Sequence, residues 1–407
     1  MPNPKITVII PTRERCDVLE SSLRTVTSQD YDNLDIIVSD NFSNDDTRGV
    51  VERANDKRIR YLNTGKRLSM SHNWEFALSK VTQGWVTILG DDDGLMPGSL
   101  GKIAELIQEY NVKAIRSRVC NYLWPAAANR PWGQLIVPVD NGVEVRHGED
   151  WLQKVMAGLY AYNELPILYS GGFAAVRLVE EIRNRSGCFY QSCTPDVYSA
   201  IALASSLDSY LYLREPLAIT GTSAHSNGRS FYYRGANRNP NPALTYSAEN
   251  NIPFHRDIPM MADGSYPLSI QALVFESYLQ TLHLRPGRPI WSHKHQLEII
   301  IASSGNYRDS IDAWAKRFAE QHSLDHAAAH QRARLLRPYI STRKIITKVS
   351  RALRCVVAGS STLAISDVFD ASIAAAVIRS RPGRLNTLVR ILKTLANGTN
   401  PDSEPLD

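Results

Sequence analysis

Three consecutive carboxylates follow a short apolar run in residues 88–100, which read ILGDDDGLMPGSL. Asp91, Asp92 and Asp93 would repel one another at this spacing, so the pattern predicts that a cation shares the space. Mg²⁺ or Mn²⁺ would suit it, because hard divalent cations prefer carboxylate oxygens. The alternative is an acidic turn at the N-terminus of the helix predicted after Pro97. One Asp would satisfy that role, and three exceed it.

Two other polar clusters, residues 12–15 and 40–46, also follow predicted strands. The apolar, β-branched runs that predict strands are 5–10, 34–40, 58–63 and 84–89, and helical spacing of apolar residues marks 17–29, 44–55 and 70–81. Strands that alternate with helices predict an α/β fold with a mostly parallel sheet covered on both faces. Ligands bind beyond the carboxyl ends of such strands, so the three clusters predict one site at that edge.

The alternation becomes less regular after residue 113. Further strands of mixed direction are predicted at 113–124, 134–139 and 209–221, and helices within 165–184 and 194–206. We expect one α/β domain over residues 1–236, an Asn- and Pro-rich linker over 237–267, a helical C-terminal region over 268–397 and a disordered tail over 398–407.

The composition is that of a soluble globular chain, with 43% hydrophobic and 21% charged residues. Residues 331–397 hold 13 Lys or Arg against 2 Asp, although the whole chain carries only +5, so an acidic body carries a basic tail. The five Cys have no zinc-type spacing and suit a reducing compartment. Neither a signal peptide nor an apolar window of membrane-spanning length is recognisable, and we expect a cytoplasmic protein.

The order of the three clusters resembles the family 2 glycosyltransferases of GT-A fold. The segments that carry the resemblance are Pro11-Thr12-Arg13, Asp40-Asn41 and Gly90-Asp91-Asp92-Asp93. It extends over about residues 5–230 and is strongest over the first hundred. It implies a Rossmann-like GT-A sheet, a nucleotide-sugar donor (a UDP-sugar first), a divalent cation and inversion at the anomeric carbon. The sequence departs from the family pattern at Arg13, Asn41 and Gly90, where an aromatic residue, a second acid and a first Asp are common.

The resemblance also implies roles for single residues. Pro11, Thr12 and Arg13 would contact the nucleotide base, and Asp40 would accept hydrogen bonds from the base or ribose. The alternative for Asp40 is an Asx-turn or a helix cap.

For the metal, alignment on the family pattern makes Asp92 the first ligand and Asp93 a second. Asp91 would contact the ribose or a metal-bound water. His225 could add an imidazole ligand, although a single His in a polar loop often has no such role.

Asp196, at the start of the predicted helix 194–206, occupies the place of the family's general base. Capping of that helix is the alternative, and Pro195 replaces the Glu that usually precedes the base. Lys66 and Arg229 could face the diphosphate, and an exposed basic loop is the alternative for Lys66.

The expected function is therefore glycosyl transfer to a hydroxyl acceptor, a glycan or a lipid-linked sugar, in cell-surface polysaccharide or glycolipid synthesis. A catalytically inactive sugar-nucleotide-binding scaffold and a phosphohydrolase with an Asp nucleophile are the rival functions. Residues 341–359 and 380–398 form basic amphipathic patterns. These could contact an anionic membrane at its cytoplasmic face, or pack on the catalytic domain or on a partner subunit of a homo-oligomer. Nucleic acid is not an expected partner.

Overall fold

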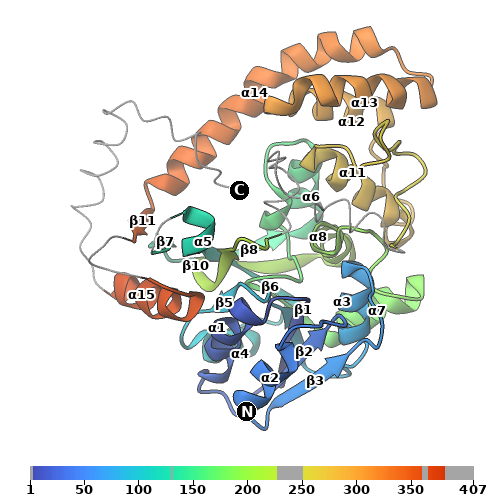
Figure 1. The fold of residues 1–407 in the computed structure, drawn as a ribbon. Coiled ribbons are helices and arrows are strands. Elements are labelled where there is room, and N and C mark those ends of the chain that lie inside the picture. The colour runs from blue at the N-terminus through green and yellow to red at the C-terminus, as the bar shows by residue number, and fades with distance from the viewer. Residues whose placement is uncertain (1–2, 130–131, 227–250, 360–364, 381–407) are drawn as a thin grey trace.

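The computed structural model describes residues 3–129, 132–226, 251–359 and 365–380 (Figure 1). Within these residues the fold is α/β, with an 11-stranded sheet that has helices on both faces. The strand order is β11-β7-β6-β9-β4-β1-β2-β3, and β10 pairs with β5, β6 and β8. The predicted α/β fold class is confirmed.

The first half of the sheet is parallel, as predicted. It contains β1 (Ile6–Thr12), β2 (Leu34–Asp40), β3 (Ile59–Asn63) and β4 (Trp85–Ile88), and the covering helices are α1 (Cys16–Thr27), α2 (Thr47–Arg53), α3 (Met70–Leu78) and α4 (Ser99–Glu109). All of β1 is buried, because it lies between β2 and β4 with helices on both faces. Thr12 pairs with Asp40 in register, which brings the first two polar clusters to one edge.

The second half of the sheet is mixed. Its strands are β5 (Gly94–Leu95), β6 (Ala114–Leu123), β7 (Gln134–Pro138), β8 (Val143–His147), β9 (Gly172–Ala175) and β10 (Ser209–Thr222). Its helical segments are α5 (Pro125–Ala128), α6 (Gly148–Met156), η1 (Tyr162–Glu164), α7 (Val176–Ser186) and α8 (Pro195–Ser206). The long strand β10 runs parallel to β6, and its last part pairs with β5. The strand β5 directly follows the triple Asp in the sequence. This topology places the loop after β10 next to the carboxylate cluster.

The C-terminal region is mainly helical, as predicted. It contains α11 (Ile270–Gln280), η2 (Leu282–Leu284), α12 (His293–Ala302), η3 (Gly305–Tyr307), α13 (Arg308–Gln321), α14 (His326–Ala352) and α15 (Val368–Ser380). Phe275, Trp314 and Phe318 from α11 and α13 share one core with Val155 of α6 and Ile201 of α8. The helical region therefore packs continuously onto the sheet domain.

Two features of this region differ from the sequence-based expectation. The helix predicted over 341–359 ends at Ala352, and Cys355–Ala358 form β11, which pairs antiparallel with β7. The β-branched residues Val356 and Val357 form this strand because the edge of the sheet offers unpaired backbone groups, which a local pattern cannot reveal. Residues 268–397 thus contribute a strand to the main sheet.

The apolar side chains predicted to pack α14 on the catalytic domain face solvent instead. Ile345, Ile346, Val349 and Leu353 are between 51% and 60% exposed. The prediction that this stripe packs on the catalytic domain is therefore wrong. The second basic stripe, 380–398, lies outside the described residues except Ser380. Arg229, residues 237–250 of the predicted linker and the tail also lie outside them. Among the helices that the structure describes, none combines the length and the hydropathy needed to cross a membrane.

Candidate active site

The carboxylate cluster lies beyond the carboxyl end of β4, at the predicted edge of the sheet. Asp91, Asp92 and Asp93 are all buried, with 3%, 5% and 0% exposure. Buried carboxylates need hydrogen-bond donors or cations, so the partners of each one define its role.

Asp93 holds two loops together. One carboxylate oxygen, Oδ2, accepts from the Gly90 amide at 3.1 Å and the Ser170 hydroxyl at 2.9 Å, and Oδ1 accepts from the Gly221 amide at 2.7 Å. Burial and the neighbouring charge of Asp92 raise the pKa of Asp93 to about 7. A carboxyl group surrounded by these donors joins β4 to β10 and has little remaining capacity to bind a metal.

Gly90 is required by this arrangement. A Cβ at residue 90 would lie 2.8 Å from Asp93 Oδ2 and 2.8 Å from the Tyr169 hydroxyl. The departure from the family's usual Asp at this position therefore has a steric cause. Gly221 is also closely packed, because a Cβ there would lie 1.8 Å from the Asp92 carbonyl oxygen.

Asp92 is held by the loop that follows β10. Its Oδ2 atom accepts from the hydroxyls of Ser223 and Ser226, each at 2.7 Å, and from the Ser223 amide at 3.3 Å. Sequence reasoning singled out His225 and Arg229 in this loop but not these two serines, because their contact with Asp92 depends on the fold. Donation to one oxygen orients the carboxylate.

Asp91 is paired with Arg15, the residue that directly precedes α1. The Arg15 guanidinium lies 2.8 Å from Asp91 Oδ1 and also donates to the His225 carbonyl oxygen. Burial raises the pKa of Asp91, and the Arg15 charge opposes that rise. Sequence reasoning placed Arg15 in the first polar cluster but assigned it no role. Its position beyond the carboxyl end of β1 was the available signal.

His225 is not brought to the predicted metal ligands. Its Nε2 atom lies 3.3 Å from Asp17 Oδ2, and both side chains are about half exposed. Within the described part of the chain, the imidazole does not converge with the carboxylates of Asp92 and Asp93. His225 contributes to the site through its carbonyl oxygen.

Asp40 and Asn41 organise the second polar cluster. Asp40 Oδ1 accepts from the Ser43 amide, three residues on, at 2.9 Å, so the carboxylate makes a local turn contact similar to the alternative role. Its other oxygen accepts from the Tyr61 hydroxyl at 2.5 Å and the Asn63 amide at 2.9 Å. Asn41 exchanges two hydrogen bonds with the backbone of Leu68, a pairing that a carboxylate could not make.

The other predicted donor-site residues lie near this edge. Pro11 and Thr12 are buried at the end of β1, and Arg13 is half-buried. Lys66 is exposed in the loop after β3. Arg67, next to it, forms an ion pair with Glu14.

Asp196 is the second residue of α8 and is half-buried. Its Oδ2 atom accepts from the Tyr162 hydroxyl at 2.6 Å. Burial raises the pKa of Asp196, while the Tyr162 hydrogen bond and the amides at the start of the helix oppose the rise. A raised pKa suits a general base, and the position also suits a helix-terminal acid.

Tyr169 lies beside the carboxylate cluster, and its phenol is also influenced by the charge of Asp196. Burial, together with the charges of Asp93, Asp92 and Asp196, raises the pKa of its phenol. The ring stacks on Trp74 with 5.3 Å between centroids, which fixes its position. The candidate base and the acidic cluster therefore both act electrostatically on one half-buried phenol.

Comparison with known sequences agrees with this geometry. Residues 7–126 match the model of the family described as glycosyl transferase family 2. The resemblance to this family is confirmed over that segment. A curated relative, the GalNAc(5)-diNAcBac-PP-undecaprenol beta-1,3-glucosyltransferase of Campylobacter jejuni, is 38% identical over 109 residues, which are 26% of this chain and 35% of the relative. The match thus spans about a third of that relative's length.

Solved structures of similar shape include S. aureus TarS 1-349 in complex with UDP-GlcNAc, with 13% identity, 92% of each chain covered and a TM-score of 0.48. Another is the mannosyltransferase PcManGT from Pyrobaculum calidifontis in complex with GDP-Man and Mn²⁺. It has 16% identity, coverage of 83% of this chain and 88% of that chain, and a TM-score of 0.39.

Proposed function

We propose that this chain is a glycosyltransferase that moves a sugar from a nucleotide-diphosphate sugar to a hydroxyl acceptor. The observation that carries the proposal is the family 2 match over residues 7–126, which contains all three polar clusters, the triple Asp included, at one sheet edge. Asp196 lies outside the matched segment, and its charge influences Tyr169, which lies beside Asp93.

The donor would bind along the ends of β1, β2 and β4. Pro11, Thr12 and Arg13 would contact the base, and Asp40 would reorient toward the base or ribose from its present hydrogen bonds. Lys66 and Arg229 would add positive charge near the diphosphate. A UDP-sugar remains our first expectation for the donor.

The residues present fit one divalent cation at Asp92. Carboxylate oxygen suits Mg²⁺ or Mn²⁺, which need only one or two protein carboxylates beside phosphate oxygens and water. Asp92 would hold the ion, with Asp91 beside it, whereas Asp93 is committed to backbone and hydroxyl donors. Such an ion would stabilise the charge of the leaving diphosphate.

Asp196 would take the proton from the acceptor hydroxyl, in a single displacement that inverts the anomeric carbon. General-base assistance of this kind is worth about 10²–10⁴ in rate. The Tyr162 hydroxyl, which donates to Asp196 Oδ2, would orient the carboxylate.

A lipid-linked sugar is our first expectation for the acceptor, with the chain at the cytoplasmic face of a membrane. The name of the curated relative, which includes a PP-undecaprenol group, supports this expectation. The exposed apolar side chains and the cations of α14 are also compatible with a peripheral membrane contact.

Release of nucleotide diphosphate from a panel of nucleotide sugars, measured with and without Mn²⁺, tests the proposal. A glycosyltransferase should release it in a metal-dependent way. An inactive scaffold should bind the nucleotide without turnover. A phosphohydrolase should act on phosphate esters instead, although Asp91 and Asp93 are engaged by Arg15 and by backbone donors.

A further inference from the structure

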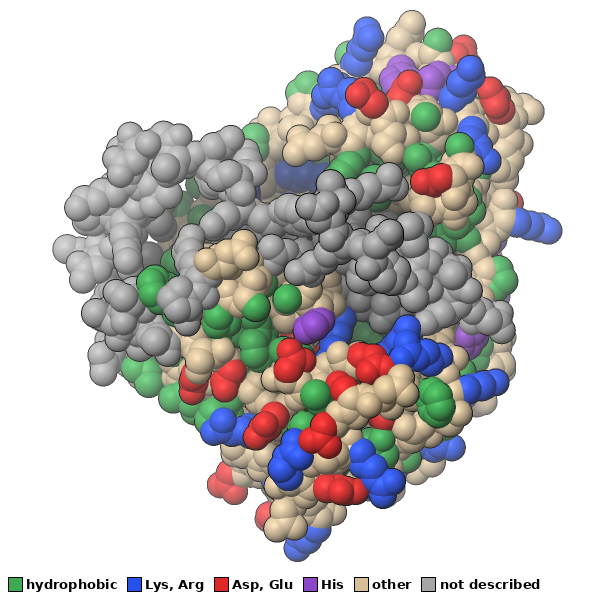
Figure 2. Space-filling view, in the orientation of Figure 1, with side chains coloured by type: hydrophobic (Ala, Val, Ile, Leu, Met, Phe, Trp, Pro, Cys, Tyr) green, Lys and Arg blue, Asp and Glu red, His purple; other side chains and the backbone are tan. Residues whose placement is uncertain are grey.

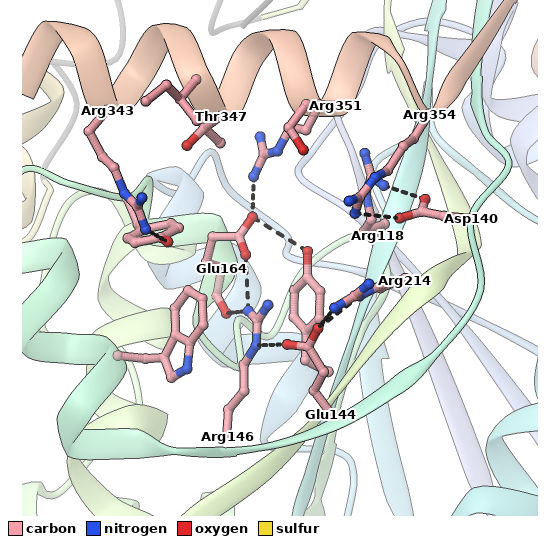
Figure 3. A pocket seen from close by; sticks show the side chains of 15 residues that line it. Arg118, Asp140, Glu144, Arg146, Glu164, Arg214, Arg343, Thr347, Arg351 and Arg354 are labelled. Atoms are coloured by element: carbon pink, nitrogen blue, oxygen red, sulfur yellow. Dashed lines mark hydrogen bonds and ion pairs between the residues drawn. The ribbon is translucent and has the colours of Figure 1, made fainter.

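A cavity of about 390 Å³ lies between the C-terminal half of α14 and the strands β6, β8 and β10 (Figure 3). Six arginines and three carboxylates line it: Arg118, Arg146, Arg214, Arg343, Arg351, Arg354, Asp140, Glu144 and Glu164. The lining therefore carries a cation excess of three, in a space large enough for a small anion.

Each carboxylate is already shared between two arginines. Glu164 pairs with Arg146 at 2.9 Å and with Arg351. Glu144 pairs with Arg146 at 3.0 Å and with Arg214, whose Nε lies 2.8 Å from it.

Asp140 forms an ion pair with Arg118 and lies 3.6 Å from the guanidinium of Arg354. Arg343 donates to the Tyr160 hydroxyl. Because a guanidinium carries five N–H donors, this lining has more donor capacity than three carboxylates can use.

The cavity is also pre-organised. The Arg146 guanidinium lies 3.6 Å from the ring centre of Trp151 and 3.2 Å from that of Tyr212. A guanidinium fork such as that of Arg146, fixed in this way, matches the oxygens of phosphate groups.

The cavity lies next to the segment that contacts the candidate base and next to the apolar face of α14. Tyr160 and Glu164 line the cavity, and Tyr162, between them in sequence, donates to Asp196. Ile346 lines the cavity and is 54% exposed, next to other exposed apolar side chains of α14.

We propose that this cavity binds the diphosphate of an amphiphilic acceptor, and that the exposed apolar face of α14 contacts its hydrocarbon chain. The inference rests on the proposed transferase function and names its acceptor class. Arginine forks would hold the anion while the attached sugar extends toward Asp196.

Calorimetric titration of the full chain tests this in buffer stripped of divalent cations, which weakens competing binding at the donor site. The two probes are inorganic diphosphate and farnesyl diphosphate. Replacing Arg343 and Arg354 together by Gln should weaken the binding of both probes at least tenfold. The Ile346→Ser variant should weaken only farnesyl diphosphate. Arg48→Gln, an exposed site on α2, is the matched control and should change neither.

If the double Arg variant and the control bind inorganic diphosphate with equal affinity, the proposed cavity site is overturned. Equal binding of the two probes, with no effect of Ile346→Ser, would overturn the contact with the hydrocarbon chain. Nucleotide release without acceptor is measured in parallel. If the double variant still releases nucleotide and binds diphosphate as the wild type does, only this inference fails. If the wild type releases no nucleotide, the proposed function fails.

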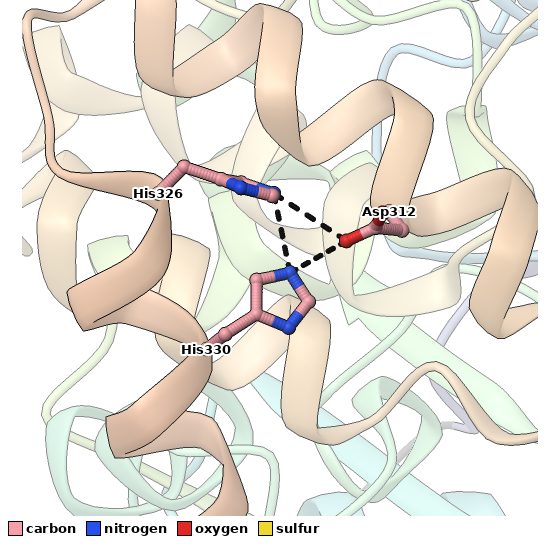
Figure 4. A group of neighbouring side chains, drawn as sticks. All are labelled: Asp312, His326 and His330. Atoms are coloured by element: carbon pink, nitrogen blue, oxygen red, sulfur yellow. Dashed lines mark hydrogen bonds and ion pairs between the residues drawn. The ribbon is translucent and has the colours of Figure 1, made fainter.

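A second, independent cluster lies where α13 meets the start of α14 (Figure 4). His326 and His330, four residues apart on α14, direct their Nε2 atoms to within 3.2 Å of each other. Asp312 Oδ1 lies 2.6 Å from His330 Nε2 and 3.4 Å from His326 Nε2. Figure 2 shows histidines beside carboxylates at the surface of this helical end.

Two of these separations, 3.2 Å and 3.4 Å, match those between ligands of one metal ion, and the third, at 2.6 Å, is a hydrogen bond that would lengthen when an ion binds. Bonds of about 2.0–2.1 Å to a tetrahedral zinc ion separate neighbouring ligand atoms by about 3.4 Å. Within the described ranges, no other trio of His, Cys, Asp or Glu side chains converges in this way. The three side chains are between 28% and 50% exposed, so an ion can reach them.

We infer that Asp312, His326 and His330 bind Zn²⁺ or a similar borderline divalent cation. Nitrogen and carboxylate donors suit this class, and water would complete the coordination. The ion would link α13 to α14, the helix that lines the cavity.

The tag-free protein, freed of metal, is titrated with Zn²⁺ while its melting temperature and the heat of binding are followed. Zn²⁺ should raise the melting temperature of the wild type and of His147→Ala, an exposed control at the end of β8. His330→Ala should lose most of that rise. An equal rise in His330→Ala, or none in the wild type at millimolar Zn²⁺, would overturn the site.

Discussion

Replacing Gly90 by Ala should damage both the stability and the activity of the protein. The new Cβ would lie 2.8 Å from Asp93 Oδ2, 2.8 Å from the Tyr169 hydroxyl and 3.0 Å from Asp93 Cγ. These atoms are fixed by hydrogen bonds and by the stack on Trp74, so they cannot move aside cheaply. Overpacking of this kind costs about 1–3 kcal/mol in the free energy of unfolding.

Gly101 offers the matched control. It lies in α4, and a Cβ there would meet nothing within 4 Å. Gly101→Ala should therefore stabilise the protein by about 0.5–1 kcal/mol through helix propensity. The two Gly→Ala variants should differ by about 1.5–4 kcal/mol, the sum of these effects.

Urea unfolding of the wild type and both variants measures the difference under identical conditions, and nucleotide release measures activity. Gly90→Ala should also lose turnover, because Asp93 and Tyr169 must shift. A Gly90→Ala variant as stable and as active as Gly101→Ala would refute the packing explanation for this departure from the family pattern.

Three further predictions concern the same edge. Arg15→Gln should destabilise the fold by about 3 kcal/mol in urea unfolding, because it leaves the Asp91 carboxylate buried without its ion pair; an unchanged midpoint contradicts this. Asp93 has a pKa of about 7 in the folded protein against an ordinary 3.8, so the folded state binds the proton more tightly. The free energy of unfolding should then fall as the pH rises from about 4 to about 7, and Asp93→Asn should lack that component when both are measured without divalent cations; identical pH profiles would refute it. Asp196→Asn should lose about 10²-fold or more in kcat with unchanged nucleotide affinity, and the raised pKa of Asp196 should place the acidic limb of kcat above pH 3.8; weakened nucleotide binding with intact kcat would favour the capping role.

The alternating half of the fold could be predicted because its signals are local. Apolar runs such as 34–40 are separated by helical spacing and by polar turns, and each one forms the expected element. β11 and the orientation of α14 could not be predicted, because they depend on which surface the chain meets after folding. The arginines of α14 face carboxylates on η1 and after β7, so its apolar residues face outward.

The site was predictable in location but not in detail. Parallel strands bring their carboxyl ends together, which placed the three clusters at one edge. Three adjacent Asp residues look equivalent in sequence, yet one pairs with Arg15, one accepts serine hydroxyls and one is buried among backbone amides. Apart from the Gly90 amide, those partners lie 76 to 134 residues away in the sequence, which no local pattern indicates.

Nucleotide release from a UDP-sugar by the wild type and by Asp92→Asn, each with and without Mn²⁺, tests the central claim most directly. We expect wild-type turnover to require the cation. The Asp92→Asn variant should have the same unfolding midpoint as the wild type but turn over at least about 100-fold more slowly, because it loses the bound cation. Equal turnover by Asp92→Asn at saturating Mn²⁺, or wild-type turnover that does not respond to the cation, would contradict the account.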